Sequence, residues 1–113
     1  MIIDDEQLSR DLLKLALESD YRLLFAASGQ EALDLLAHEQ PDIILLDIIL
    51  PDSNGLDLLE SIITACPESK VVVCSSIGQE QVIQKSLDLG AKAFIQKPFT
   101  PEKVTEVLES LEV

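Results

Sequence analysis

Five polar side chains lie at the ends of short apolar runs, and their types suit the chemistry of phosphoryl groups. They are Asp4, Asp5, Asp47, Ser75 and Lys97. Carboxylates that lie close together repel one another unless a cation lies between them or one takes up a proton. Since the set contains no histidine or cysteine, a hard, oxygen-preferring ion such as Mg²⁺ suits it best. A carboxylate beside Mg²⁺, a hydroxyl and an ammonium group can attack and bind a phosphoryl group, and we predict Asp47 as the nucleophile.

The segments that must position these side chains alternate between short apolar runs and stretches in which apolar residues recur at helical spacing. The runs that predict strands cover residues 2–3, 21–26, 43–46, 70–74 and 93–95. Amphipathic stretches after each run predict helices. Strands that alternate with helices form a parallel sheet covered by helices on both faces. We therefore predict an α/β fold, a doubly wound five-stranded parallel sheet of the flavodoxin-like type with strand order 2-1-3-4-5.

The predicted topology places these side chains together. Ligands of open α/β sheets bind beyond the carboxyl ends of the strands. In the predicted order, the strands that lead to Asp4, Asp47, Ser75 and Lys97 are neighbours. Each residue alone has an ordinary explanation, such as a helix cap, a loop hydroxyl that bonds its own backbone, or a surface lysine. Their joint placement favours a site.

Two local patterns carry further expectations. Leu8, Leu12, Leu15 and Ala16 recur at helical spacing and predict the buried face of the first helix. The segment 51–55, Pro-Asp-Ser-Asn-Gly, has the composition of a turn.

The composition limits the classes of protein to which the chain can belong. Its 113 residues are the usual size of one domain, and we expect residues 1–113 to form a single one. The formal charge of −13 at pH 7 argues against nucleic acid and anionic lipid as partners. Hydrophobic residues make up 47% of the chain, which distinguishes it from a disordered acidic tail. The apolar runs are far shorter than the roughly 20 residues that a membrane span needs.

Three observations bear on location and on other chemistries. The N-terminus lacks the basic region and small-residue cleavage site of a signal peptide. Cys66 and Cys74 are far apart and outside any C-x-x-C motif, so we expect free thiols in a reducing cytoplasm. His38 is the only histidine and lies in polar surroundings typical of a helix end, which argues against a Ser–His–Asp triad.

The chain resembles the response-regulator receiver domains of two-component signalling over nearly its whole length. The motifs are individually short, but they occur in the family's order and spacing. They are Asp4-Asp5-Glu6, Asp47-x-x-x-Pro51-x-x-x-Gly55, Ser75, Gly90-Ala91 and Phe94-Ile95-Gln96-Lys97-Pro98-Phe99. Within the second motif, the resemblance implies structural roles for Pro51 and Gly55. The second half of the chain is most similar to stand-alone chemotaxis regulators, and the first half to receivers attached to output domains.

The resemblance implies a phosphoryl acceptor and a metal site. Asp47 corresponds to the aspartate that receives a phosphoryl group from a sensor histidine kinase or a phosphotransfer protein. Asp5 corresponds to a direct Mg²⁺ ligand, with Asp4 acting through water. Asp47 and the backbone carbonyl of Ile49 complete the ligand set.

The resemblance also implies how the phosphorylated state is read. Lys97 would pair with the phosphoryl group, and its peptide bond to Pro98 would be cis. Ser75 corresponds to the hydroxyl that moves toward the phosphoryl group, and Phe94 to the aromatic ring that rotates inward behind it. The face formed by the fourth helix, the fifth strand of the sheet and the last helix would bind an output domain or a target protein.

Three features depart from the family's pattern. Only residues 1–3 precede Asp4, where strands of about five residues are usual, so we expect residues upstream to be missing. Phe94 stands where tyrosine is commoner, so its movement would depend on packing alone. Ile49 is apolar beside the acceptor and would limit the attack of water on an acyl phosphate.

The expected function is therefore a signalling switch and not an enzyme, and three alternatives are weighed against it. An aspartyl-phosphate phosphatase would need a second carboxylate two residues after Asp47, where this chain has Ile49. A flavodoxin would need a small polar phosphate loop after the first strand, where Asp4-Asp5-Glu6 would repel a flavin phosphate. A receiver that docks partners without being phosphorylated stays open.

Overall fold

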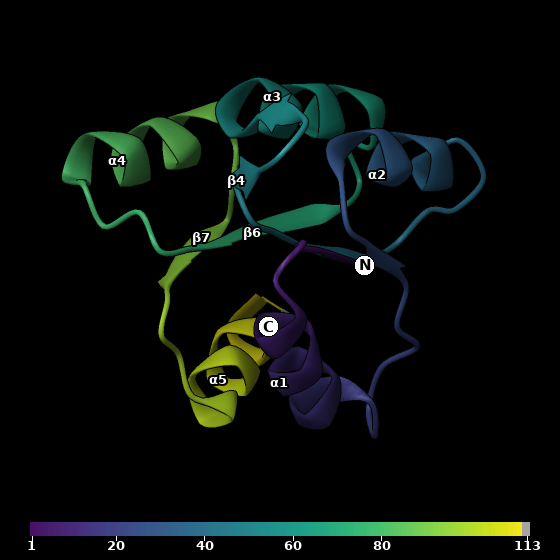
Figure 1. The fold of residues 1–113 in the computed structure, drawn as a ribbon, viewed down its shortest axis with the longest axis vertical. Coiled ribbons are helices and arrows are strands. Elements are labelled where there is room, and N and C mark those ends of the chain that lie inside the picture. The colour runs from purple at the N-terminus through teal and green to yellow at the C-terminus, as the bar shows by residue number, and fades with distance from the viewer. Residues whose placement is uncertain (112–113) are drawn as a thin grey trace.

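A five-stranded parallel sheet lies at the centre of the computed structural model, which describes residues 1–111 (Figure 1). Its strands run in the order β2-β1-β3-β6-β7, which confirms the predicted fold and strand order. In chain order they are β1 (Ile2–Ile3), β2 (Phe25–Ala26), β3 (Ile43–Leu46), β6 (Lys70–Ser75) and β7 (Ala93–Gln96).

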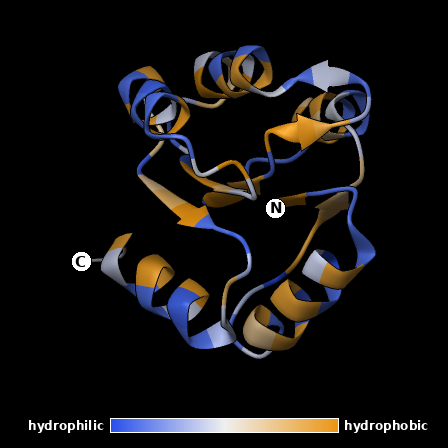
Figure 2. Cartoon of the chain, turned by 60° about the vertical axis from the view of Figure 1, so that its left-hand side comes forward, coloured by the Kyte–Doolittle hydropathy of each residue, from blue (hydrophilic) through white to orange (hydrophobic). Residues whose placement is uncertain are grey.

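Helices cover both faces of this sheet. Figure 1 shows α2, α3 and α4 on one face and α1 and α5 on the other. Their bounds are α1 (Gln7–Leu17), α2 (Gly29–Leu36), α3 (Gly55–Ala65), α4 (Glu80–Leu89) and α5 (Pro101–Leu111). Hydrophobic strands lie between helices that carry hydrophilic residues on their outer sides (Figure 2).

The central strands are apolar at successive positions because each of their faces meets a helical layer. Leu46 and Val73 belong to the apolar cluster beneath α2, α3 and α4, whereas Leu45 and Val72 belong to the cluster beneath α1 and α5. Side chains alternate between the two faces of a strand, so a strand covered on both faces has no polar positions. The rigid sheet that results fixes where each strand ends.

The buried face of α1 differs from the prediction. Leu8 and Leu15 are 66% and 70% exposed, and the buried residues of the helix are Ser9, Leu13 and Leu17. The helix contains more leucines than one face can hold, so helical spacing allowed two choices of buried face. Packing against the sheet and α5 selects the face that contains Leu13 and Leu17.

Two other local predictions were inaccurate. The strand expected over 21–26 is confined to Phe25–Ala26, where it pairs with β1. The segment after Asp47 contains a short antiparallel pair, β4 (Ile49–Leu50) and β5 (Ser53–Asn54), with the predicted turn between the two strands.

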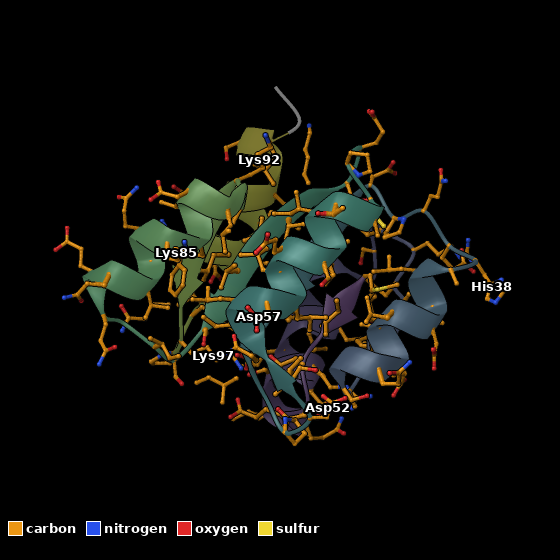
Figure 3. All side chains as sticks on the ribbon, turned by 90° about the horizontal axis from the view of Figure 1, so that it is seen from above. His38, Asp52, Asp57, Lys85, Lys92 and Lys97 are labelled. Atoms are coloured by element: carbon orange, nitrogen blue, oxygen red, sulfur yellow. The ribbon has the colours of Figure 1, made fainter. Side chains whose placement is uncertain are left out.

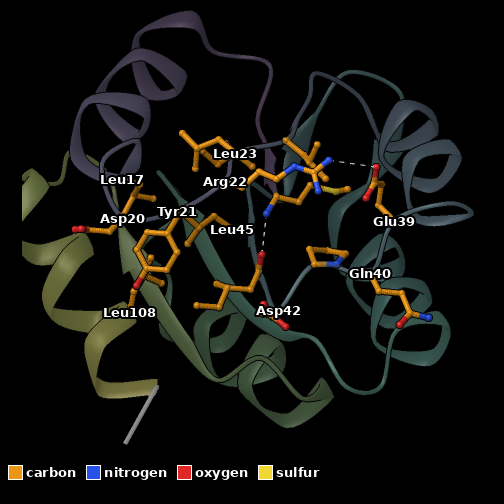
Figure 4. A pocket seen from close by; sticks show the side chains of 15 residues that line it. Leu17, Asp20, Tyr21, Arg22, Leu23, Glu39, Gln40, Asp42, Leu45 and Leu108 are labelled. Carbon is orange, nitrogen blue, oxygen red and sulfur yellow. Dashed lines mark hydrogen bonds and ion pairs between the residues drawn. The ribbon is translucent and has the colours of Figure 1, made fainter.

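A hollow of about 350 Å³ opens at the amino ends of the strands (Figure 4). Ile2 and Ile43, which begin β1 and β3, line it together with Tyr21, Leu23 and Leu108. It therefore lies at the opposite edge of the sheet from the predicted site. Separately, no helix within residues 1–111 has the length and apolar character required to cross a membrane.

Candidate functional site

The carboxyl ends of four neighbouring strands bring the predicted residues to one edge of the sheet. Asp4 follows β1, Asp47 follows β3, Ser75 ends β6 and Lys97 follows β7. Figure 3 shows Lys97 at one side of the molecule and Lys92, which precedes β7, at the opposite side. The strand order therefore places together residues that are up to 93 positions apart in the chain.

Lys97 joins two of the carboxylates directly. Its Nζ donates hydrogen bonds to Asp4 Oδ2 and to Asp47 Oδ2, both at 2.9 Å. The exposed fractions of the three side chains are 10% for Lys97, 3% for Asp4 and 6% for Asp47. The other oxygens are also satisfied, since Asp4 Oδ1 accepts from the Glu6 N–H at 2.9 Å and Asp47 Oδ1 from the Ile49 N–H at 2.8 Å. Such a satisfied arrangement is what a buried ion pair requires.

Burial and pairing shift the pKa values of this group. Burial acts to lower the pKa of Lys97, but hydrogen bonds to Asp47 and Asp4 outweigh it and raise the pKa well above its ordinary value. Burial raises the pKa of Asp4, although its hydrogen bond with Lys97 acts in the opposite direction. The ammonium is therefore charged at neutral pH, and ionised Asp4 is destabilised by its surroundings.

Asp4→Asn should raise the free energy of unfolding of the metal-free protein near neutral pH. The pKa of Asp4 is higher in the folded protein than its ordinary value of 3.8, which applies to the unfolded chain. The folded state therefore loses stability relative to the unfolded chain as the pH rises through the range between these two pKa values. An amide removes this loss, while Lys97 keeps its contacts with Asp47 and Glu6. Urea unfolding in a chelator should show the gain near neutral pH and little difference below the ordinary pKa. A less stable variant at neutral pH would contradict this reading.

Asp5 completes an acidic cluster, defined here as the carboxylates of Asp4, Asp5 and Asp47. One oxygen from each lies within 4.8 Å of the others. Asp4 and Asp47 are buried and Asp5 is exposed, so the cluster opens toward solvent. Its hard oxygen donors fit a divalent cation such as Mg²⁺ better than a softer, sulfur-preferring metal.

The remaining predicted residues lie on or directly after the neighbouring strands β6 and β7. Ser75 is fully buried, and its Oγ accepts from the Ile77 N–H at 3.5 Å. Phe94 is half-buried and packs against the apolar cluster beneath α2, α3 and α4. The peptide bond between Lys97 and Pro98 is cis, as the resemblance implies.

The loop after Asp47 is held by a close backbone approach at its end. A Cβ added to Gly55 would lie 2.0 Å from the Ile48 carbonyl oxygen and 2.3 Å from the Ile48 Cβ. Pro51, in contrast, is exposed at the turn between β4 and β5. Gly55 is therefore needed where α3 meets the backbone next to the acceptor.

Gly55→Ala should lower the free energy of unfolding by about 1–3 kcal/mol, because the added methyl group displaces backbone atoms. Chemical denaturation measures the change. Gly78→Ala is the matched control, since the atoms nearest to a Cβ there belong to the flexible Gln96 side chain. Equal stability of the two variants would contradict the close approach at Gly55.

Two residues that received no predicted role extend the site. Glu6 Oε1 lies 3.8 Å from Lys97 Nζ and accepts a hydrogen bond from Ser9 Oγ at 2.5 Å. The hydrogen bond from Ser9 and the nearby ammonium lower the pKa of Glu6. Glu6 stood in the first motif, but only the folded structure reveals its contact with Lys97. Ser9 could have been noticed as a polar residue in line with Leu13 and Leu17.

A further contact, also absent from the predictions, ties the acceptor loop to α2. The Asp52 carboxylate accepts hydrogen bonds from the Gly29 N–H at 2.9 Å and the Gln30 N–H at 3.1 Å. These bonds lower the pKa of Asp52. The partners are more than 20 positions apart, so no local pattern signals the contact.

The acidic cluster includes neither the cysteines nor the histidine. Cys66 and Cys74 are free thiols, as expected, and burial raises the pKa of Cys74 to about 12. His38 lies well away from Lys97 in Figure 3. The described site therefore consists of oxygen ligands and one ammonium group.

Comparison with known proteins identifies the family. Residues 1–109 match the family model of the response regulator receiver domain. The chain is 35% identical to chemotaxis protein CheY of Thermotoga maritima, with 98% of this chain and 94% of that protein aligned. It is 30% identical to sporulation initiation phosphotransferase F of Bacillus subtilis, with 96% and 89% aligned.

Solved structures agree with this assignment. A CheY-like response regulator receiver domain protein from Methanospirillum hungatei superposes with a TM-score of 0.91 at 32% identity, covering 97% of this chain and 89% of that one. The sequence, the fold and the residues at the strand ends thus lead to one assignment. The chain belongs to the response regulator receiver domains, the phospho-accepting signalling switches of two-component systems.

Proposed function

We propose that the chain accepts a phosphoryl group on Asp47, from the histidine of a sensor kinase or phosphotransfer protein in the cytoplasm. The observation that carries the proposal is the position of the Asp47 carboxylate, hydrogen-bonded by Lys97 Nζ at 2.9 Å and within 4.8 Å of two further carboxylates. In the proposed cation site, Asp5 and Asp47 would bind Mg²⁺ directly, Asp4 would act through water, and the Ile49 carbonyl would add a ligand. When bound, Mg²⁺ would neutralise charge on the phosphoryl oxygens.

The residues of the chain supply the remaining chemistry. A carboxylate oxygen of Asp47 forms a bond to phosphorus as the bond to the donor imidazole nitrogen breaks, and that nitrogen keeps the electron pair. Lys97 binds a phosphoryl oxygen as a charged donor, and Ser75 Oγ donates to another. Ser75 and Lys97 are supplied by neighbouring strands, since β6 pairs with β7.

The proposed conformational response to phosphorylation also involves β6 and β7. Movement of Ser75 toward the phosphoryl group would leave space that Phe94 enters from its half-buried position. Because β7 carries Phe94 and lies at the edge of the sheet beside α4, the change would reach the face formed by α4, β7 and α5. We propose that this face binds the output domain or target protein.

Incubation with acetyl phosphate and Mg²⁺ tests the proposal. The intact protein should gain one phosphoryl group, measured by mass spectrometry, and a chelator should prevent the gain. A chain that stays unmodified with acetyl phosphate and with phosphorylated kinases would instead be a receiver that only docks its partners.

A further inference from the structure

The ammonium group of Lys97 occupies the carboxylates that a cation would need. Its two hydrogen bonds, each 2.9 Å, are to oxygens of Asp4 and Asp47, and both residues belong to the acidic cluster. A divalent cation and an ammonium group on the same carboxylates would repel each other strongly, because these side chains are largely shielded from water. We therefore expect a bound cation to draw Lys97 away from at least one of these partners.

A third carboxylate lies within reach of the ammonium group but outside the acidic cluster. Within residues 1–111, Lys97 forms ion pairs with Asp4, Asp47 and Glu6. Glu6 Oε1 is 3.8 Å from Lys97 Nζ, so a small movement of the flexible lysine side chain would bring the two into hydrogen-bonding distance. A cation bound to the acidic cluster would not occupy Glu6, so Glu6 would remain available as a partner for the Lys97 ammonium group.

Ser9 holds Glu6 in this position. Its Oγ donates to Glu6 Oε1 at 2.5 Å, and this is the oxygen that faces Lys97. Ser9 is 3% exposed and lies on the buried face of α1 with Leu13 and Leu17. A buried hydroxyl needs a partner, and packing prevents this one from turning toward water. The Glu6 side chain, 57% exposed, therefore has a fixed anchor in the core.

We propose that Glu6, oriented by Ser9, is a positioning residue that receives the Lys97 ammonium group when a divalent cation occupies the acidic cluster. This inference rests on the proposed function, since it assumes that the cluster binds Mg²⁺. Glu6 reduces the cost of displacing Lys97 and keeps the ammonium group beside Asp47, ready for a phosphoryl oxygen. A lysine without this partner would have to turn toward solvent.

A double-mutant cycle followed by calorimetric titration with Mg²⁺ tests the proposal. Glu6→Gln should weaken Mg²⁺ affinity about three- to five-fold in the presence of Lys97, the range expected for a partly exposed ion pair. In a Lys97→Met background the same substitution should weaken the affinity by less than about two-fold, because only the long-range attraction between Glu6 and the cation is then lost. Ser9→Ala should weaken affinity in the same direction as Glu6→Gln.

Asp11→Asn is the matched control, since Asp11 is an exposed carboxylate on α1, the helix that Glu6 precedes. It should change the affinity by less than about two-fold. Equal weakening by Glu6→Gln in both backgrounds would overturn the proposal, because Glu6 would then act as a negative charge near the cation. A wild-type protein that binds Mg²⁺ but is unaffected by Glu6→Gln would overturn this inference alone. A wild-type protein that binds no Mg²⁺ would overturn the proposed cation site as well.

Discussion

Asp47→Asn should reduce phosphoryl uptake from acetyl phosphate at least about 100-fold, because an amide lacks the nucleophilic oxygen of a carboxylate. The substitution preserves shape, and the amide oxygen can still accept the hydrogen bond that the Ile49 N–H donates to Asp47 Oδ1 at 2.8 Å. The change therefore removes the reacting group with little effect on the loop. Mass spectrometry of the intact protein, at several times after addition of acetyl phosphate and Mg²⁺, measures the rate.

Asp57→Asn is the matched control for this prediction. Asp57 is an exposed aspartate in the first turn of α3, and its substitution should leave the rate of uptake unchanged. Retention of wild-type uptake by Asp47→Asn would show that another residue is the acceptor. Peptide mapping of the modified protein would then identify that residue.

Lys97→Met should lower the free energy of unfolding by about 3 kcal/mol near neutral pH in the presence of a chelator. The substitution leaves Asp4 and Asp47 buried without the ammonium group that neutralises them, and their side chains are 3% and 6% exposed. The same change should also slow phosphoryl uptake, because a donor to the phosphoryl oxygens is lost. Urea denaturation followed by circular dichroism measures the loss of stability.

The loss of stability in Lys97→Met should depend on the charge of Asp4 and Asp47 and on the position of the substituted lysine. Mg²⁺ or mild acid should restore much of the stability of Lys97→Met, because each neutralises the carboxylates that the lysine no longer pairs with. Lys92→Met is the control, since Lys92 is an exposed lysine at the other end of β7 (Figure 3). Equal stabilities of the two variants in chelator would mean that the ion pairs of Lys97 contribute nothing to the fold.

Lys97 acts as an internal counterion for the carboxylates of the site. The chain has a formal charge of −13, so acidic residues brought together by folding need a cation from within the chain or from solution. Lys97 fills this role for Asp4 and Asp47. Entry of a divalent cation would then exchange one counterion for another and free the lysine for a second partner.

Much of the site could be predicted from the sequence because strand ends are visible in it. Asp4 and Asp47 directly follow apolar runs. Such runs alternate with amphipathic stretches, and this alternation predicts a parallel sheet whose strands end at a common edge. The prediction of the buried face of α1 was only partly right: Ala16 packs against the core, whereas Leu8 and Leu15 are exposed. Leu8 and Leu15 satisfy helical spacing as well as Leu13 and Leu17 do, and spacing does not reveal which face meets the sheet.

The sequence by itself thus determined the fold class and the set of residues at the strand ends, since both follow from local patterns and general rules of chain connection. The predicted strand order was that of the flavodoxin-like type, one of the common orders of doubly wound sheets. Only the tertiary structure decided which atoms meet there. The hydrogen bond between Lys97 and Asp4 joins residues 93 positions apart, and the contact between Asp52 and Gly29 joins the acceptor loop to the first residue of α2. The orientation of Glu6 by Ser9 depends on which face of α1 is buried. Such contacts depend on how the layers pack, and no pattern within a single segment encodes that packing.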